Sequence, residues 1–274
     1  MKRSDRLVAM TNHLIEHPSQ LVSLPFFSAE FDSAKSSISE DLAIVNNILQ
    51  QQGIGYLESI SGAAGGVKYI PSYSRTNSEK FIDQLCEQLE DPDRLLPGGY
   101  LYMSDILGEP SKVRNIGRLF ASYFSTSEVD VVVTVATKGI PLAYAVASFL
   151  NVPVVIVRRD PKVTEGSTVS INYVSGSSKK IQTMVLSKRS LQEGSRVCII
   201  DDFMKAGGTV NGMKNLMEEF RAEVVAIGVL AEAEDEDEER VITDYTSLIQ
   251  INNVDVKNKQ IEVRRGNYFR RELN

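Results

Sequence analysis

The sequence contains no tryptophan, two cysteines and two histidines. Cys86 and Cys198 are far apart and stand in different sequence contexts, so they indicate neither a disulfide framework nor a metal site, and we expect a reducing, cytoplasmic environment. We expect His13 and His17 to be structural or solvent-facing, and we assign them no catalysis. These absences direct attention away from disulfide and metal chemistry.

Long hydrophobic runs are also missing. No segment approaches the roughly 18 consecutive apolar residues of a membrane span, so we expect no membrane partner. The first residues have no uninterrupted apolar stretch, so we expect no secretory signal. A Gly-x-x-x-x-Gly-Lys-Ser/Thr loop, which binds phosphates in many nucleotide-hydrolysing proteins, is absent as well.

Positive charge is scarce. The net charge is −6, and residues 1–74 carry five Lys and Arg against seven Asp and Glu. Any binding to nucleic acid must therefore depend on where the few cations lie. The length of 274 residues leaves room for about two domains of roughly 150 residues each.

The first 74 residues predict an all-helical segment followed by a hairpin. We expect helices at 4–16, 23–31 and 35–52, and strands at 56–60 and 67–70. The third helix has one apolar face, formed by Ile38, Leu42, Val45 and Leu49. Glycines at 62, 65 and 66 are typical of the turn between two strands. We expect residues 71–77 to form a linker.

Residues 75–274 alternate apolar runs with helical patterns, which predicts an α/β domain with a parallel sheet covered on both faces. The expected strands are 129–135, 153–157, 196–201 and 224–230, and the expected helices are 78–89, 112–123, 141–150 and 208–220. A polar stretch from 158 to 189 contains alternating segments at 168–174 and 181–186, and we interpret it as a flap over the site. The acidic run at 232–239 is expected to be a solvated loop.

The most specific motif runs from Val197 to Thr209. An apolar strand ends at Asp201 and Asp202, and a loop of small residues then opens a helix. Glycines let backbone N–H groups approach a phosphate, and a helix N-terminus favours an anion. By themselves, the paired carboxylates could belong to a solvated loop. The adjoining glycine loop favours instead a binding site for a sugar phosphate, in which the carboxylates accept hydrogen bonds from the sugar hydroxyls.

This segment resembles the phosphoribosyl-pyrophosphate loop of type I phosphoribosyltransferases, and the resemblance covers roughly residues 75–274. It implies that Asp201 and Asp202 hold the ribose hydroxyls, and that the loop holds the 5′-phosphate. The loop comprises Phe203, Met204, Lys205, Ala206, Gly207, Gly208 and Thr209. Ala206 departs from the family pattern, which has threonine there, whereas the adjacent Lys205 adds a cation.

A second loop supports this resemblance. In the family, the loop after an earlier strand binds pyrophosphate through its backbone, and here that loop comprises Ala136, Thr137, Lys138 and Gly139. Lys138 could otherwise be an ordinary surface lysine. Tyr102 and Lys162 are further expected ligand contacts, and Lys162 lies at the base of the expected flap.

The combination of the two parts is similar to the purine operon repressors of Gram-positive bacteria. The match lies in two stretches, Phe203–Thr209 and Ala34–Asp41, and the N-terminal part resembles a winged helix-turn-helix. This resemblance implies a homodimeric repressor of purine biosynthesis and transport genes, with domains at 1–74 and 75–274. Its effector would be phosphoribosyl pyrophosphate, which carries any Mg²⁺ itself, and no prosthetic group is implied. A guanine alarmone, which has a ribose and pyrophosphates, is chemically compatible with the same site.

Operator DNA is the implied partner of the first domain. The end of the third helix would enter the major groove, and the glycine turn would lie near the backbone or minor groove. The expected DNA contacts are Lys2, Arg3, Arg6, Lys35, Ser36, Ser37, Ser39 and Lys68. Polar residues that open a helix are more often caps, so this interpretation depends on the order of the elements.

The alternative function is an active purine phosphoribosyltransferase with an accessory N-terminal domain. Three features disfavour it: Ala206 in the phosphate loop, the attached winged helix, and the lack of recognisable purine-specific residues. We therefore expect the second domain to be inactive as an enzyme.

Overall fold

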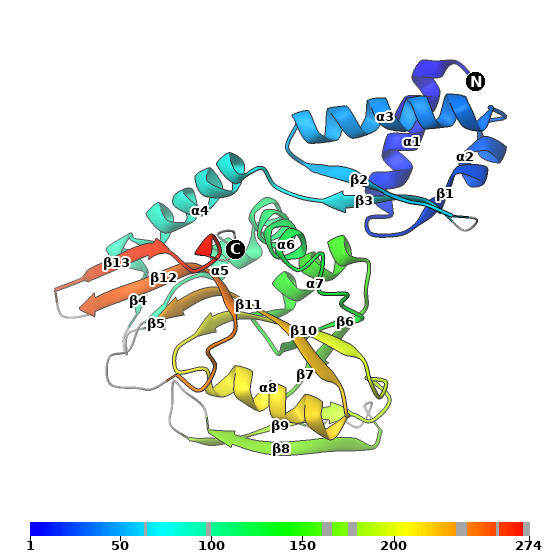
Figure 1. Ribbon diagram of the computed structural model, residues 1–274. Coiled ribbons are helices and arrows are strands. Elements are labelled where there is room, and N and C mark those ends of the chain that lie inside the picture. The colour runs from blue at the N-terminus through cyan, green and yellow to red at the C-terminus, as the bar shows by residue number, and fades with distance from the viewer. Residues whose placement is uncertain are drawn as a thin grey trace.

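The computed structural model of the chain describes residues 1–62, 65–96, 100–160, 166–174, 180–233, 240–255 and 258–270 (Figure 1). A small N-terminal part of helices and a three-stranded sheet lies beside a larger α/β part (Figure 1). No helix within the described ranges has the length and apolar composition needed to cross a bilayer.

The N-terminal part has the predicted order of elements. It comprises α1 (Arg3–Glu16), β1 (Val22–Ser23), α2 (Leu24–Glu30), α3 (Lys35–Gln51), β2 (Gly55–Ile60) and β3 (Gly66–Pro71). The apolar stripe of α3 is buried as predicted, and it packs with Met10 of α1 and Phe27 of α2. The two-residue strand β1, too short to predict, completes an antiparallel sheet in the order β1-β3-β2.

The larger part is built on one six-stranded sheet. Its elements are α4 (Arg75–Leu89), the 3₁₀ helix η1 (Pro92–Arg94), β4 (Leu95–Leu96), β5 (Tyr100–Leu101), α5 (Ser104–Gly108), α6 (Pro110–Tyr123), β6 (Val131–Val135), α7 (Ile140–Leu150), β7 (Val154–Val157), β8 (Thr168–Val174), β9 (Ile181–Ser187), β10 (Arg196–Met204), α8 (Gly208–Glu219), β11 (Glu223–Ala233), β12 (Thr246–Asp255) and β13 (Gln260–Arg265). The sheet order is β13-β12-β11-β10-β6-β7, and only β13 runs antiparallel to its neighbour. The four predicted strands are confirmed, whereas β12 and β13 escaped prediction.

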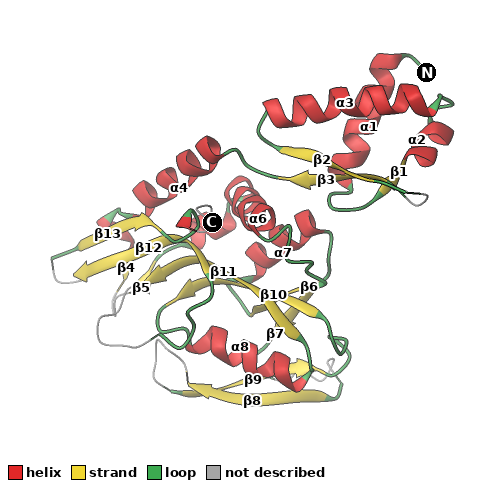
Figure 2. Ribbon diagram, viewed as in Figure 1, coloured by secondary structure: helices red, strands yellow, loops and turns green. Residues whose placement is uncertain are grey.

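Helices cover both faces of this sheet, with α4, α6 and α7 on one side and α8 on the other (Figure 2). Alternate residues of β10 serve the two faces: Cys198 and Ile200 belong to one buried cluster, and Val197 and Ile199 to the other. This division explains why the predicted strands are apolar at nearly every position.

The hairpin β8–β9 packs on the outer face of α8 (Figure 1). Tyr173 and Met184 are buried there, and both lie against Gly212 of α8. This segment was expected to be a flap over the site. Its described strands pack instead on α8 as part of the core, and residues 161–165 and 175–179 of the expected flap lie outside the described residues.

A short connection joins the two parts. Residues 71–77 were expected to form a linker, but β3 ends at Pro71 and α4 begins at Arg75, with Ser74 as its N-cap. The Ser19 hydroxyl donates to the Phe149 carbonyl at 3.0 Å, which ties the N-terminal part to the end of α7.

Candidate functional site

A cavity lies where the carboxyl ends of β6 and β10 meet. The two strands are parallel neighbours, so the loops that follow them come together at one edge of the sheet. The cavity has a volume of about 500 Å³. Its walls are formed by Leu96, Tyr100, Leu101, Met103, Val135, Ala136, Thr137, Lys138, Arg159, Asp201, Asp202, Phe203 and Thr209.

Two adjacent carboxyl groups form one wall. Asp201 is only 3% exposed, and its Oδ1 accepts the backbone N–H of Asp202 at 3.0 Å. Burial, and then the charge of Asp202, raise the pKa of Asp201 well above its usual range. Burial also raises the pKa of Asp202, although Asp201 and Lys138 oppose this shift. The pair therefore suits a ligand that supplies hydroxyl donors or a cation.

The loop of residues 203–209, between β10 and α8, encloses a small hollow next to this wall. Gly207 has φ +85° and forms the N-cap of α8, a conformation that a side chain would disfavour. Residues 203–210 enclose a hollow of about 60 Å³. Backbone N–H groups at the start of a helix attract anions, so the hollow suits a phosphate.

The loop after β6 forms the opposite wall. A Cβ at Gly139 would lie 2.3 Å from the Thr134 hydroxyl oxygen, so only glycine fits there. The Ala136–Thr137 peptide bond is cis. Lys138 lines the same cavity as Asp202, and its charge lowers the pKa of Asp202 against the effect of burial. This wall can therefore receive a second anionic group beside the carboxylates.

The structure brings together most residues that the sequence selected for the ligand. Seven of them line the larger cavity: Asp201, Asp202, Phe203, Thr209, Ala136, Thr137 and Lys138. Met204, Lys205, Ala206, Gly207 and Gly208 surround the smaller hollow. Gly139 closes the loop against Asp201, with 3.3 Å between its Cβ position and Oδ1.

One selected residue lies elsewhere, and another falls outside the described residues. Tyr102 does not line the cavity; its backbone N–H donates to the Arg94 carbonyl at 2.9 Å, and Tyr100 reaches the cavity instead. Lys162 lies outside the described residues. Sequence reasoning did not select Arg159, which lies two residues after the end of β7 at Val157. Its position after a strand next to β6 was the signal that could have identified it.

The N-terminal part presents a second candidate surface. Lys35, Ser36 and Ser39 are exposed at the start of α3, whose N-cap, Ala34, has no side-chain hydrogen bond. These polar residues are therefore not the caps of the helix. A groove of about 750 Å³ runs between this end of α3 and the β2–β3 hairpin, and Lys35 and Gly62 both line it.

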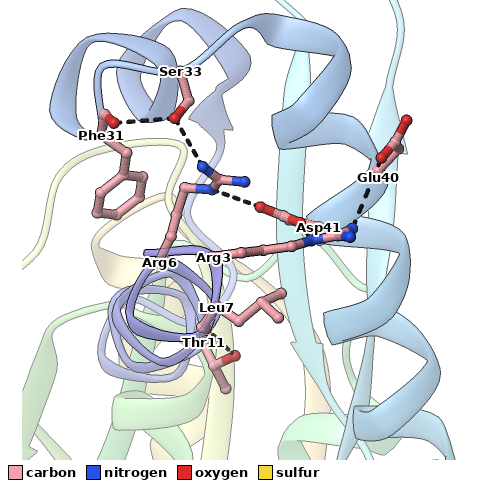
Figure 3. A network of polar contacts seen from close by, with 8 residues as sticks. All are labelled: Arg3, Arg6, Leu7, Thr11, Phe31, Ser33, Glu40 and Asp41. Atoms are coloured by element: carbon pink, nitrogen blue, oxygen red, sulfur yellow. Dashed lines mark hydrogen bonds and ion pairs between the residues drawn. The ribbon is translucent and has the colours of Figure 1, made fainter. Parts of the chain in front are cut away.

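Arg6 has an internal role that the sequence did not reveal. Its side chain is 11% exposed, and its Nε donates to Oδ2 of the buried Asp41 at 2.6 Å (Figure 3). Its Nη1 also donates to the Ser33 hydroxyl at 2.9 Å. Arg6 therefore joins α1 to α3, and the structure does not present it to DNA as we expected.

The other expected DNA contacts are more accessible. Arg3 also donates to Asp41, at 2.8 Å, but its side chain is 55% exposed. Lys2 and Ser37 lie near the same end of the molecule as Arg3 and Lys35, with Lys2 exposed and Ser37 half-buried. Lys68 is half-buried on β3, where Glu58 of β2 is its cross-strand neighbour.

Comparison with known proteins identifies both parts. The family model described as "Bacterial purine repressor, N-terminal" matches residues 2–71, and that of the phosphoribosyl transferase domain matches residues 103–264. The adenine phosphoribosyltransferase of Thermoanaerobacter pseudethanolicus has a similar fold, with a TM-score of 0.53 at 22% identity over 60% of this chain and 99% of that one.

Relatives over the full length are transcriptional regulators. The chain is 60% identical to the purine biosynthesis transcriptional repressor of Bacillus subtilis, over 98% of this chain and 94% of the relative. It is 48% identical to the purine biosynthesis transcriptional activator of Lactococcus lactis, over 98% and 99%. The chain belongs to the bacterial purine repressor family, with an N-terminal DNA-binding domain and a phosphoribosyltransferase fold.

Proposed function

We propose that this protein represses purine biosynthesis and transport genes, and that phosphoribosyl pyrophosphate releases it from operator DNA. Residues 1–74 bind the DNA and residues 75–274 bind the effector. The observation that carries the proposal is the adjacent Asp201–Asp202 carboxyl pair, which lines one cavity together with Lys138 and lies beside the N-terminus of α8.

The arrangement of charges fits the three parts of this effector. Hydroxyls of the ribose can donate to Asp201 and Asp202, and the 5′-phosphate can occupy the hollow at the start of α8. The pyrophosphate can lie along Ala136–Gly139, near Lys138 and Arg159. Mg²⁺ bound to the pyrophosphate would further relieve the repulsion between the two carboxylates. A guanine alarmone shares these groups and is expected to compete.

DNA binding depends on few cations. Lys2, Arg3 and Lys35 are exposed, whereas Arg6 is engaged by Asp41. We therefore propose that a homodimer binds, since two copies double the number of phosphate contacts. The start of α3 enters the major groove and the hairpin lies beside it.

We also propose that the second domain has no transferase activity. Ala206 replaces a hydroxyl that would donate to the phosphate, and the described cavity walls carry no side-chain amide that would recognise a purine base. Incubation with phosphoribosyl pyrophosphate, Mg²⁺ and each purine base tests this proposal. Formation of a nucleotide would show that the protein is an enzyme.

One titration tests the regulatory proposal. Fluorescently labelled operator DNA is bound by the protein, and phosphoribosyl pyrophosphate is added at fixed salt. We expect release of the DNA, and we expect the alarmone to prevent that release. Ribose 5-phosphate is the matched control, because it lacks the pyrophosphate. DNA that stays bound at saturating effector, shown by calorimetry, would exclude induction by this compound.

A further inference from the structure

Glu232 is a buried carboxylate one strand away from the phosphate loop. The sequence placed it in a solvated acidic loop, but it lies on β11, opposite Met204 of β10, and is 3% exposed. Residues 234–239 of that run lie outside the described residues. The Ser247 hydroxyl donates to Glu232 at 2.6 Å, and the Tyr245 hydroxyl and Arg240 donate to its other oxygen. A carboxylate buried with this many donors is held firmly in place.

These contacts fix Arg240 in turn. Its guanidinium donates to the Ala233 carbonyl at 3.1 Å and lies 5.6 Å from the centre of the Tyr245 ring. Arg240 therefore has three separate contacts, two with β11 and one with Tyr245, the residue before β12. A side chain held in this way also fixes the backbone that carries it.

The two residues after Arg240 touch the phosphate loop directly. The backbone N–H of Val241 donates to the Ala206 carbonyl at 3.2 Å. Ile242 is buried, and the three atoms nearest to a Cβ built at Gly207 all belong to Ile242, at 3.5 Å. The loop is made of small residues here, so it has few side chains of its own to hold its shape.

We propose that Glu232 and Arg240 are positioning residues for the 5′-phosphate. They anchor residues 240–242, and this segment braces the loop at Ala206 and Gly207 in the shape that receives the phosphate. The inference rests on the proposed function, because it assigns a support to the same effector site. Neither side chain lines the cavity, so both act through the brace.

The test separates the 5′-phosphate from the pyrophosphate. Calorimetry measures the affinities of ribose 5-phosphate, phosphoribosyl pyrophosphate and inorganic pyrophosphate for the parent, Glu232→Gln and Arg240→Ala. We expect about a tenfold loss of affinity for the first two ligands, as for a lost charged hydrogen bond, and an unchanged affinity for pyrophosphate. Arg221→Ala is the matched control, since Arg221 pairs with Glu193 at the surface.

Tyr245→Phe keeps the test decisive if the other variants fold poorly. It removes one donor to Glu232 and leaves the ring in place. The affinity for ribose 5-phosphate should therefore fall relative to that for pyrophosphate, by a smaller factor than in the other variants. Equal affinities in parent and variants, or equal losses for all three ligands, would overturn the inference. If the parent binds phosphoribosyl pyrophosphate and the variants bind it with the same affinity, the inference fails but the proposed function remains intact. A parent that binds no phosphoribosyl ligand would overturn both.

Discussion

Two buried aspartates in the two parts of this chain have opposite surroundings. Asp41 is fully buried on α3, and its carboxylate accepts hydrogen bonds from Arg6 and Arg3. Burial opposes ionisation, but the two arginines outweigh it and hold the pKa of Asp41 below its usual value. Asp201 is nearly as inaccessible, yet burial and the charge of the adjacent Asp202 raise its pKa, and the opposing effect of Arg159 is smaller.

The difference separates a structural carboxylate from a binding one. Asp41 is neutralised within the chain, so it has no need of a ligand and joins two helices instead. Among the described residues, Lys138 and Arg159 oppose the raised pKa values of Asp202 and Asp201 without reversing them, which fits our proposal that a bound effector completes their environment. Mutating each aspartate should therefore have opposite consequences for stability.

The largest effect is expected from Asp41→Ala. The guanidinium of Arg6 would then be nearly buried without its partner, which costs about 3 to 5 kcal/mol. We expect the N-terminal domain to unfold at lower urea concentration and DNA binding to be lost, while effector binding persists. Glu40→Ala is the matched control: Glu40 is exposed and lies 3.8 Å from Arg3, so its loss should change stability little. Equal effects of both variants would contradict the structural role of Asp41.

Asp201→Asn should stabilise the ligand-free protein at neutral pH. Because burial raises the pKa of Asp201 in the folded state, this group makes an unfavourable contribution to folding at every pH above its unfolded pKa of about 3.9. The variant lacks this penalty, so we expect a gain of up to about 1 kcal/mol at pH 7 that disappears near pH 4. Asp41 acts in the other sense: its contribution is present at neutral pH and is lost as the pH falls through its lowered pKa. Urea unfolding of both proteins from pH 4 to 7 measures the difference. Lower stability of the variant at pH 7 would show that Asp201 is neutralised within the chain.

Lys35→Ala should weaken operator binding and leave effector affinity unchanged. If Lys35 contacts a DNA phosphate, each copy adds about one unit to the steepness with which the logarithm of the affinity falls with the logarithm of the salt concentration. Its removal should make this slope shallower by that amount. A contact with a base would relax sequence preference instead. Lys188→Ala, at an exposed site in the other domain, is the control. Identical salt slopes and sequence preferences in all three proteins would remove Lys35 from the interface.

The smallest effect is expected at the contact between the two parts. Ser19→Ala removes the hydrogen bond to the Phe149 carbonyl, worth about 0.5 to 1.5 kcal/mol. Because Phe149 lies on the helix that follows the Lys138 loop, we expect a change of at most about tenfold in the effect of effector on DNA affinity. Ser125→Ala removes a comparable hydrogen bond at the surface and is the control. A change in effector affinity measured without DNA would show that Ser19 acts on the site itself.

The sequence predicted those elements whose periodicity is strong. The apolar face of α3 and the apolar strands β6, β7, β10 and β11 were found because burial on one or both faces leaves a regular pattern. β13 was missed because it is an edge strand with exposed charged residues, so its composition is that of a loop. β12 was missed because the polar residues Thr246, Ser247 and Asn252, which are buried in the structure, interrupt its apolar residues.

Of the candidate site, the sequence predicted the loops that follow neighbouring parallel strands. The loops after β6 and β10 were found because parallel strands bring their carboxyl ends together. Tyr100 depends on how a distant segment folds over the cavity, which composition does not reveal, whereas the position of Arg159 after a strand next to β6 could have identified it. Arg6 looked like a DNA contact because counting charges cannot show that Asp41 is buried beside it.

The most direct test combines effector and DNA in one experiment on Asp201→Asn with Asp202→Asn. The double variant keeps the size of both side chains but loses the charged acceptors for the ribose hydroxyls, so its affinity for phosphoribosyl pyrophosphate should fall at least about tenfold. The N-terminal domain is unchanged, so operator affinity without effector should equal that of the parent. In a gel-shift titration we expect the parent to leave the DNA at effector concentrations where the double variant stays bound. Release of the double variant at the same effector concentration as the parent would contradict the assignment of this carboxyl pair as the sensor.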